Sequence, residues 1–370
     1  MKIIFSFNKQ GYEAQCWESE IRTASTEEAT FHPFNHGQYF DPGFYDDSVK
    51  LDRLYQTGDP RLMRMYAELE RLVQEWGAEA LFVTNCPPYH PDFLKTIPLY
   101  KVLYSTDDPG ATYMRTIPYL HAYQHVMFCA LGYSSDFSLE EKMRYCGMVN
   151  ADWLPIAVMD FEFDAQRTEE ALFSNTRDID AVYVGSPWRQ KLDVLFKCKR
   201  ALGKRLRIHG LFEWRHNLYV NARYGFPGWV RPVSFSDRVK VYQHSKVGLN
   251  IHWNQYGFGN QRLFHLPANG VMQISDCPSL VGRVFKDGAE IVTYSSTGEL
   301  IEKLQYYIDH DQEREEIARR AYRRTMEQYR FKVVMQKATQ MISRGMQRTK
   351  LQPRSPLQGG VASHSSEIPA

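Results

Sequence analysis

Short apolar runs alternate with longer amphipathic stretches along most of the chain. In the first half the apolar runs are KIIFSF (2–7), ALFVTN (80–85), KVLYSTDD (101–108), HVMFCAL (125–131) and WLPIAV (153–158). Between the first two, residues 61–77 place Leu62, Met65 and Leu69 on one helical face, and Gly77 ends the helix. Strands that alternate with helices predict a parallel sheet covered by helices on both faces.

A second series of the same kind follows a polar stretch at 164–178. Its expected strands are 181–185, 205–210, 246–253, 271–276 and 290–295. Its expected helices are 188–202, 236–245, 260–268, 297–309 and 311–328. Two successive Rossmann-like series predict a two-domain α/β protein with a cleft between the domains. We expect a first domain at 1–163, a linker at 164–178 and a second domain at 179–330.

Residues 331–346 predict one further helix, because apolar side chains recur there at helical spacing. These side chains are Phe331, Val334, Met335, Ala338, Met341 and Ile342. A helix in this position can cross back onto the first domain. Residues 347–370 combine Pro, Gly and Ser with little apolar content, so we expect a disordered tail.

Composition supports a globular protein and narrows its partners. Hydrophobic residues make up 43% of the 370 residues and charged residues 24%. Lys and Arg (45) barely exceed Asp and Glu (43), which argues against a dedicated nucleic-acid binder. Residues 314–350 hold eleven Lys and Arg against three Asp and Glu. Peripheral membrane contact remains open there, but the pairs Glu315–Arg319 and Glu316–Arg320 favour a solvated helix face.

The six cysteines form no CxxC pair, which argues against a zinc ribbon or a redox motif. They are typical of free thiols in a reducing compartment. The first residues, MKIIFSFNKQGYEAQ, lack the features of a signal peptide, and no apolar run approaches roughly 18 residues. We therefore expect a cytoplasmic protein without a membrane span.

Candidate ligand-binding residues follow the predicted strands, because ligands of open α/β sheets bind beyond the carboxyl ends of the strands. Gly185 and Ser186 make a tight turn, and Arg189 and Lys191 open the next helix. Farther along, the loop NQYGFGNQR brings in Gly259, Asn260 and Arg262. Backbone N–H groups, a helix N-terminus and an arginine fork together suit the phosphates of a nucleotide. His265 lies one turn further along and either reaches a ribose or packs within the protein.

Two aspartates end a strand on the cleft side of the predicted first domain. In STDDPG, either Asp107 or Asp108 can act as a general base or orient a second substrate. The alternative is that Asp108 and Pro109 only cap the following helix.

No metal site is predicted. The triplet Asp178-Ile179-Asp180 precedes its strand on the amino side of the sheet, and His121 and His125 lack the glutamate of a zincin motif.

The order of these motifs resembles a known superfamily. From about 181 to 331, the segments VYVGS, KVGLNIHW, NQRLFHLPANGVMQISD and FKDGAEIVTY are similar to the glycosyltransferase group 1 superfamily of GT-B fold. The spore-maturation (CgeB-like) branch is the nearest in pattern, and VLYSTDDPG and WLPIAV in the first half also resemble it. The resemblance implies two Rossmann-like domains that face each other across a cleft.

The same resemblance implies a function. A hexosyltransferase of this kind moves a sugar from a nucleotide sugar, such as a UDP-sugar, on the second domain to an acceptor on the first. It needs no metal or other cofactor. The acceptor stays open among glycan, protein, small molecule and modified nucleobase. The alternatives are a sugar-nucleotide epimerase or hydrolase, and a catalytically silent nucleotide-sugar binding protein.

The chain departs from the family pattern at two positions. The family usually reads R-x-F-E, in which the glutamate binds the ribose. Arg262 and Phe264 match this pattern, whereas His265 takes the place of the glutamate. A second family glutamate, eight positions upstream, is Gly257 here. An imidazole can still hydrogen-bond a ribose hydroxyl, but it lacks the charge of a carboxylate.

Overall fold

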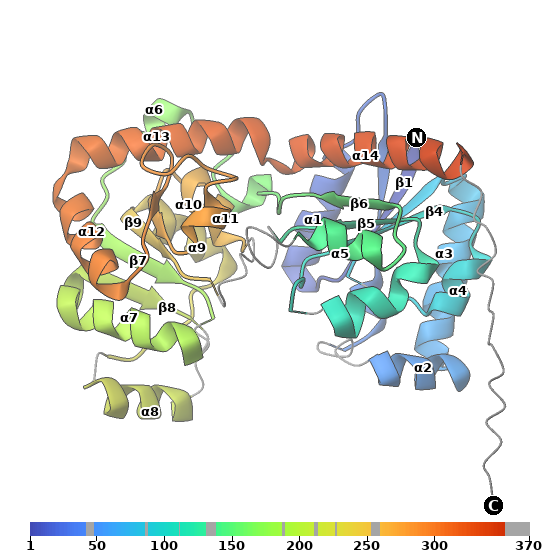
Figure 1. The fold of residues 1–370 in the computed structure, drawn as a ribbon, viewed down its shortest axis with the longest axis horizontal. Coiled ribbons are helices and arrows are strands. Elements are labelled where there is room, and N and C mark those ends of the chain that lie inside the picture. The colour runs from blue at the N-terminus through green and yellow to red at the C-terminus, as the bar shows by residue number, and fades with distance from the viewer. Residues whose placement is uncertain are drawn as a thin grey trace, which may run out of the picture.

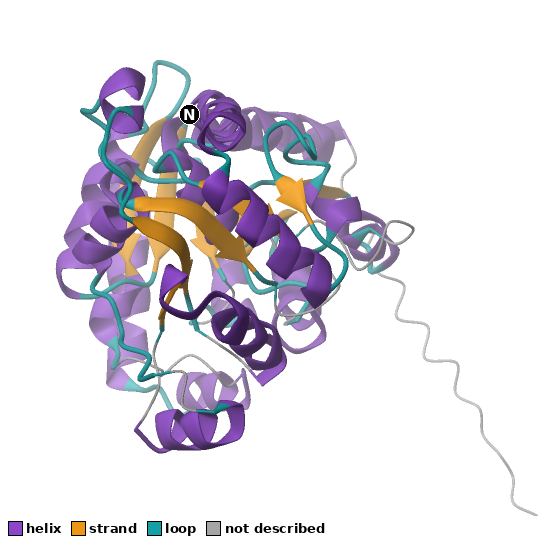
Figure 2. Cartoon of the chain, turned by 90° about the vertical axis from the view of Figure 1, so that its left-hand side faces the viewer, coloured by secondary structure: helices purple, strands orange, loops and turns teal. Residues whose placement is uncertain are grey.

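The computed structural model (Figure 1) describes residues 1–41, 48–85, 88–110, 112–130, 138–186, 189–210, 214–225, 228–252 and 260–351. Two α/β halves lie side by side. The consecutive helices α13 (Asp311–Gln328) and α14 (Phe331–Leu351) run along one edge, α13 over the second half and α14 over the first. Seen from the side of the second half, helices cover both faces of its sheet (Figure 2).

The first half is built on a six-stranded sheet in the order β2-β1-β3-β4-β5-β6, in which neighbouring strands pair in parallel. The strands are β1 (Lys2–Phe7), β2 (Thr30–Asn35), β3 (Ala80–Thr84), β4 (Tyr100–Ser105), β5 (His125–Phe128) and β6 (Asn150–Trp153). The helices are α1 (Gly11–Thr23), α2 (Ser48–Gln56), α3 (Pro60–Trp76), α4 (Pro91–Thr96) and α5 (Leu139–Tyr145). Shorter helical turns are η1 (His36–Tyr39), η2 (Thr112–Thr116), η3 (Ile117–Ala122) and η4 (Asp160–Glu162).

Local chemistry explains the ends of α3. The Asp59 carboxylate accepts hydrogen bonds from the N–H groups of Arg61 (3.0 Å) and Leu62 (3.4 Å), which satisfies donors at the helix start. Pro60 fits the first turn, where its missing N–H costs nothing. Gly77 ends the helix in the left-handed conformation (φ 64°), as its position predicts.

The second half holds a five-stranded sheet in the order β11-β10-β9-β7-β8, also parallel. The strands are β7 (Ile179–Val184), β8 (Leu206–His209), β9 (Ser245–Asn250), β10 (Met272–Ser275) and β11 (Val292–Thr293). The helices are α6 (Glu169–Phe173), α7 (Arg189–Leu202), α8 (Trp214–Tyr224), α9 (Phe235–Gln243), α10 (Arg262–Ala268), α11 (Pro278–Val281), α12 (Thr297–Asp309) and α13 (Asp311–Gln328), with the short turn η5 (Gly203–Arg205).

The last helix, α14 (Phe331–Leu351), crosses back to the first sheet (Figure 1). Its buried side chains Phe331, Val334 and Met335 share an apolar cluster with Phe5 and Phe82 of the first sheet. The predicted crossover helix is therefore confirmed. The helix continues to Leu351. The expectation of a disordered tail from residue 347 is therefore wrong for its first residues, because α14 is still helical there. Residues 352–370 lie outside the described residues.

Several elements differ from the sequence-based expectation. β2 and α8 were not expected, because Pro33 interrupts the strand pattern TFHPFN and polar side chains dominate WRHNLYVNARY. The strand expected at 153–158 is instead β6 at Asn150–Trp153, and Pro155 follows its end. The expected linker contains α6, which the Thr168 hydroxyl caps. Among the described helices, none is long and apolar enough to cross a membrane.

Candidate functional site

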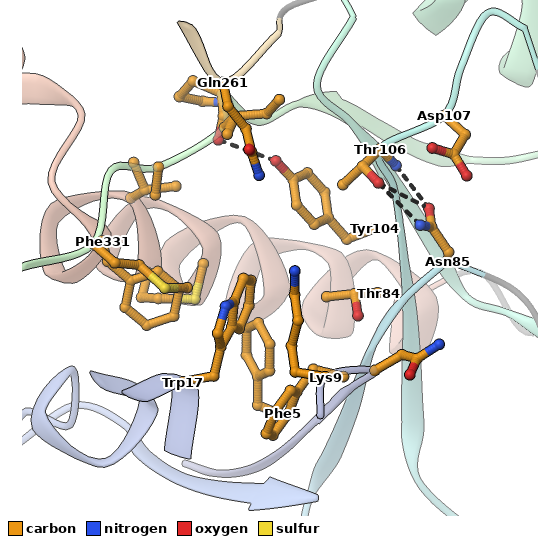
Figure 3. Close-up of a pocket in the computed structure, with 18 of the residues that line it drawn as sticks. Phe5, Lys9, Trp17, Thr84, Asn85, Tyr104, Thr106, Asp107, Gln261 and Phe331 are labelled. Carbon is orange, nitrogen blue, oxygen red and sulfur yellow. Dashed lines mark hydrogen bonds between the residues drawn. The ribbon is translucent and has the colours of Figure 1, made fainter. Parts of the chain in front are cut away.

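A cavity of about 350 Å³ opens at the carboxyl ends of β1, β3 and β4 (Figure 3). Its floor is apolar and comes from the first half and α14: Phe5, Phe7, Trp17, Phe331, Val334 and Met335. Its rim is polar and includes Lys9, Asn85, Thr106, Asp107 and Arg115. The connector between the halves, which is the segment between β6 and β7, adds Ile156 and Glu162. Gln261 reaches in from the second half. The cavity thus has a place for both an apolar and a polar part of a ligand.

Asn85 joins the ends of β3 and β4 at the rim. Its backbone has the left-handed conformation (φ 62°), which asparagine tolerates better than most residues. Its side chain donates to the Thr106 hydroxyl (3.0 Å) and accepts from the Thr106 N–H (2.9 Å). This pair of hydrogen bonds fixes the backbone immediately before Asp107.

The two candidate aspartates occupy different environments. Asp107 lines the cavity, its side chain is 46% exposed, and it pairs with Arg115 at 3.1 Å. Asp108 is fully buried and accepts hydrogen bonds from the hydroxyls of Thr112 (2.7 Å) and Thr116 (3.0 Å). Burial raises the pKa of the Asp108 carboxyl, although these hydroxyls oppose the shift. Of the two, Asp107 is therefore the one positioned to meet a substrate.

On the opposite side of the cavity, Lys9 of the rim lies over Trp17 of the floor. The Lys9 ammonium lies 5.3 Å from the centre of the Trp17 ring and pairs with Glu13 at 2.6 Å. Trp17 in turn stacks on Phe7, with the ring centres 5.7 Å apart. Neither residue was expected in the site from the sequence. Lys9 follows the first strand, so the strand-end rule applied to 2–7 would have found it.

Arg262 ties together the strand ends of the second half. Its guanidinium donates to the carbonyl of Val184 (3.0 Å), the last residue of β7, and to that of Ile251 (3.1 Å), which follows β9. It also lies over the Tyr183 ring at 4.8 Å. Gly185 has a φ of 154°, and a Cβ there would overlap Nη1 of Arg262. The structure therefore brings Gly185 and Arg262 into contact.

Lys191 adds a second cation to this group. Its side chain is buried, and burial together with the neighbouring charge of Arg262 lowers its pKa to about 7, while Asp276 opposes the shift. Asn260 donates to the Asn250 side chain at 2.7 Å and accepts from the Leu263 N–H at 3.1 Å. Ser186 is exposed beside this group. The side chain of Arg189 and the whole of Gly257 and Gly259 lie outside the described residues.

His265 lies away from the group around Arg262. Its ring is buried, and its Nε2 lies 2.9 Å from the Glu162 carboxylate, an ion-pair distance without hydrogen-bond geometry. Burial by itself would raise the pKa of Glu162. The attraction of His265, the Met159 N–H and Arg238 outweigh burial and lower it. The contact of His265 with a ribose stays a prediction, since the ring here faces the connector.

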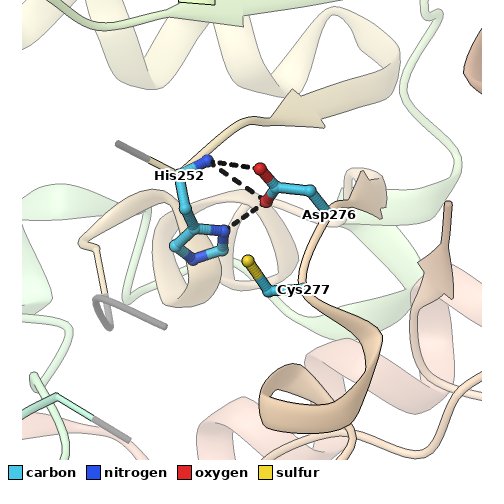
Figure 4. A group of neighbouring side chains, drawn as sticks. All are labelled: His252, Asp276 and Cys277. Atoms are coloured by element: carbon cyan, nitrogen blue, oxygen red, sulfur yellow. Dashed lines mark hydrogen bonds and ion pairs between the residues drawn. The ribbon is translucent and has the colours of Figure 1, made fainter. Parts of the chain in front are cut away.

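A further group gathers at the ends of β9 and β10: His252, Asp276 and Cys277 (Figure 4). Thiolate, imidazole and carboxylate are ligand types that suit zinc. In the described arrangement, however, His252 Nδ1 and Asp276 Oδ1 lie 2.5 Å apart, as a hydrogen-bonded pair. Asp276 also accepts from the His252 N–H at 3.1 and 3.0 Å. The carboxylate thus orients the imidazole beside the thiol.

Comparisons with known proteins agree with this architecture. Residues 171–340 match the model of the family described as glycosyl transferase-like. A comparison with curated protein sequences gives no match.

Solved structures cover nearly the whole chain. Sucrose-phosphate synthase from Thermosynechococcus elongatus has a TM-score of 0.60 at 10% identity, covering 94% of this chain and 99% of that one. Anabaena Alr3699/HepE in complex with UDP-glucose has a TM-score of 0.58 at 12% identity, covering 94% and 100%. A glycosyltransferase from Rickettsia africae has a TM-score of 0.57 at 8% identity, covering 93% and 98%. The family match thus covers residues 171–340, and the similarity to these solved structures shows that the whole chain has the same two-sheet fold as they have.

Proposed function

We propose that the protein transfers a sugar from a nucleotide sugar to an acceptor bound in the cavity. The observation that carries the proposal is where the cavity lies. It opens at the carboxyl ends of the first sheet and meets Gln261, next to the Arg262 group of the second. In open α/β sheets this is the edge at which ligands bind. We also propose that the protein belongs to the spore-maturation (CgeB-like) branch and that it is located in the cytoplasm.

The acceptor half of the reaction is assigned to Asp107. An exposed carboxylate on the rim can take the proton of an acceptor hydroxyl as the new glycosidic bond forms. Arg115, 3.1 Å from Asp107, would hold this carboxylate in position on the rim. The floor of Phe5, Trp17 and Phe331 would pack against an apolar or ring face of the acceptor.

The donor half is assigned to Arg262 and Lys191. Their charges would stabilise the diphosphate that leaves when the sugar is transferred. Nε of Arg262 is buried without a hydrogen-bond partner in the described part of the chain. Two protein cations can supply the charge that a divalent metal supplies elsewhere, so the proposed transfer is independent of metal. UDP-glucose is the first donor to test, because Anabaena Alr3699/HepE is similar in fold and was solved with it.

A thermal-shift screen against nucleotide sugars tests donor binding directly. A ligand at 100 times its dissociation constant should stabilise the protein by about 2.7 kcal/mol. Lys191→Met should reduce the shift at a fixed ligand concentration. The matched control is Lys199→Met. Lys199 lies on the same helix α7 but donates to the carbonyl of Leu206, so this variant should leave the shift unchanged. If no nucleotide sugar shifts the melting temperature, the proposal is wrong.

Turnover then separates the possible activities. We expect nucleoside diphosphate to be released in proportion to the acceptor added, and to the same extent with or without EDTA. Release of free sugar without acceptor would identify a hydrolase, and a changed sugar on intact nucleotide an epimerase. Binding without any turnover across acceptor classes would identify a silent nucleotide-sugar binding protein. Each of these three results contradicts the proposed transfer.

A further inference from the structure

One segment of the second half is rich in lysine and arginine. Between residues 189 and 231 the chain has eleven Lys and Arg against two Asp and Glu, although the whole chain is nearly neutral. This segment comprises α7, η5, β8, α8 and residues 228–231. β8 is the edge strand of its sheet. In Figure 1, α8 lies at the outer end of the second half, on the opposite side from α13 and α14.

Hydrogen bonds and apolar contacts hold α8 and residues 228–231 against the edge of the sheet. Asn217 of α8 donates to the Val230 carbonyl (3.3 Å) and accepts from the Val230 N–H (3.2 Å). Gly210, after β8, donates its N–H to the carbonyl of Arg231 at 3.2 Å. Val220 of α8 and Val230 share an apolar cluster with α7. α8 and residues 228–231 therefore hold a fixed position along the sheet edge.

A groove of about 370 Å³ runs along this edge. Its charged and aromatic lining includes Lys204, Arg207, Trp229 and Arg231. Trp229 is 58% exposed, and so large an exposed fraction is unusual for a tryptophan. We call these four residues the basic groove.

The outer face of α8 continues the basic groove with apolar side chains. Asn217, Val220 and Asn221 are buried on the inner face, whereas Leu218 and Tyr219 are 52% and 56% exposed. Arg215 and Arg223 are exposed on the same helix, one turn on either side of Tyr219. A helix that carries apolar side chains among arginines on its outer face is typical of attachment to an anionic membrane surface.

We propose that the basic groove and the outer face of α8 bind an anionic phospholipid membrane. Lys204, Arg207 and Arg231 would contact the headgroups, while Leu218, Tyr219 and Trp229 would enter the interface. Charge complementarity selects an anionic occupant. The exposed aliphatic Leu218 favours a lipid surface over a polynucleotide, whose bases stack on aromatic rings. This inference does not rest on the proposed sugar transfer.

Co-sedimentation of the full chain with lipid vesicles tests the proposal. Binding is expected to vesicles in which a third of the lipid is phosphatidylglycerol, and not to vesicles of phosphatidylcholine alone. It should weaken as salt is raised, because screening reduces the attraction of the headgroups. Lys204→Gln/Arg231→Gln and, separately, Leu218→Ser/Tyr219→Ser should each lower the partition coefficient by about tenfold.

Matched variants on the first half control for general changes in charge and apolarity. Tyr145→Ser/Val149→Ser removes exposed apolar groups (93% and 57% exposed), and Lys95→Gln/Arg144→Gln removes two exposed cations. Both should bind vesicles as the unchanged protein does. Equal losses in test and control variants would overturn the proposal. So would absence of vesicle binding, or binding to single-stranded polynucleotide alone with the same dependence on Lys204 and Arg231.

Discussion

Asp107 and Asp108 are adjacent in sequence yet suited to different tasks. Asp107 faces the cavity with a partly exposed carboxylate, and Asp108 is enclosed by the hydroxyls of Thr112 and Thr116. The sequence placed both at a strand end, and only the direction of each side chain separates a candidate base from a loop anchor. Position along the chain cannot supply that direction, because neighbouring residues after a strand point to different sides.

Asp107→Asn should lower kcat by about 10²–10⁴ with unchanged donor affinity, because the amide cannot take a proton and the residue lies on the acceptor side. Steady-state kinetics and calorimetry of donor binding measure the two effects. Asp108→Asn is the control and should act on stability, by about 1 kcal/mol, through its hydroxyl partners. Normal kcat in Asp107→Asn would remove this residue from catalysis.

His265→Leu should destabilise the fold by roughly 3–5 kcal/mol, because it leaves the Glu162 carboxylate buried without the imidazole that lies 2.9 Å from it. His265→Leu/Glu162→Met should recover most of the loss, since no buried carboxylate then remains at this place. Urea unfolding at neutral pH measures both. Equal stability of the single and the double variant would show that the pair does not interact.

Lys191→Met should stabilise the protein at pH 7 by roughly 1–3 kcal/mol, because burial holds the pKa of Lys191 near 7. Between pH about 7 and about 10.4 the unfolded chain binds more protons at this site than the folded one. Wild-type stability should therefore rise with pH across that window, and the rise should shrink in the variant. Unfolding curves at several pH values test this, and identical pH slopes in the two proteins would refute it.

At the scale of elements, close backbone approach fixes how the second half is assembled. Gly185 after β7 leaves room for Arg262, and Gly248 in β9 faces the side chain of Leu266, so that α10 packs directly on the sheet. The sequence indicated a tight turn at Gly185 and a phosphate-binding arginine at position 262. It did not indicate that the first makes room for the second, because the two are brought together only by strand pairing.

Gly185→Ala should destabilise the protein by about 1–3 kcal/mol and weaken nucleotide binding, because the new Cβ overlaps Nη1 of Arg262. Thermal unfolding and calorimetry measure the two effects. The control is Gly203→Ala, at φ 57° with open space around its Cβ, which should lose stability through backbone strain alone and keep its affinity. Affinity retained in Gly185→Ala would separate Arg262 from the donor site.

At the scale of the whole molecule, α14 joins the halves by packing its apolar face on the first sheet. Gly345 lies where the helix passes closest to Tyr100 and His125. Helical alanine usually stabilises relative to glycine by about 1 kcal/mol. Here packing opposes propensity, because an added Cβ would overlap the Tyr100 hydroxyl and lie 3.0 Å from His125 Nδ1.

Gly345→Ala should therefore lower the melting temperature, and Gly345→Ala/Tyr100→Phe should regain part of the loss. Gly298→Ala in α12 is the matched control, since its nearest neighbour atom lies 3.9 Å away and propensity alone should decide. A higher melting temperature in Gly345→Ala would show that α14 does not pack tightly at this point.

Elements and their order were determined by the sequence. Apolar periodicity and terminal signals such as Asp59, Pro60 and Gly77 act within a few residues, so strands, helices and the crossover at 331 could be predicted. The sequence pattern did not predict β2, which contains Pro33, the polar helix α8, or the helices α1, α2, α4 and α5, because their stability comes from packing rather than from local pattern. The resemblance to a glycosyltransferase superfamily followed from the same local motifs in their order.

The partners of individual side chains were decided only by the tertiary structure. His265 meets Glu162, which lies between β6 and β7. Arg262 bonds to carbonyls at the ends of β7 and β9, and Trp17 lines a cavity to which α14 also contributes. Each contact joins segments far apart in the chain. The distance between the two side chains of such a contact depends on the order of strands in the sheet and on how the two halves meet. Neither of these is encoded in a periodic pattern of the sequence.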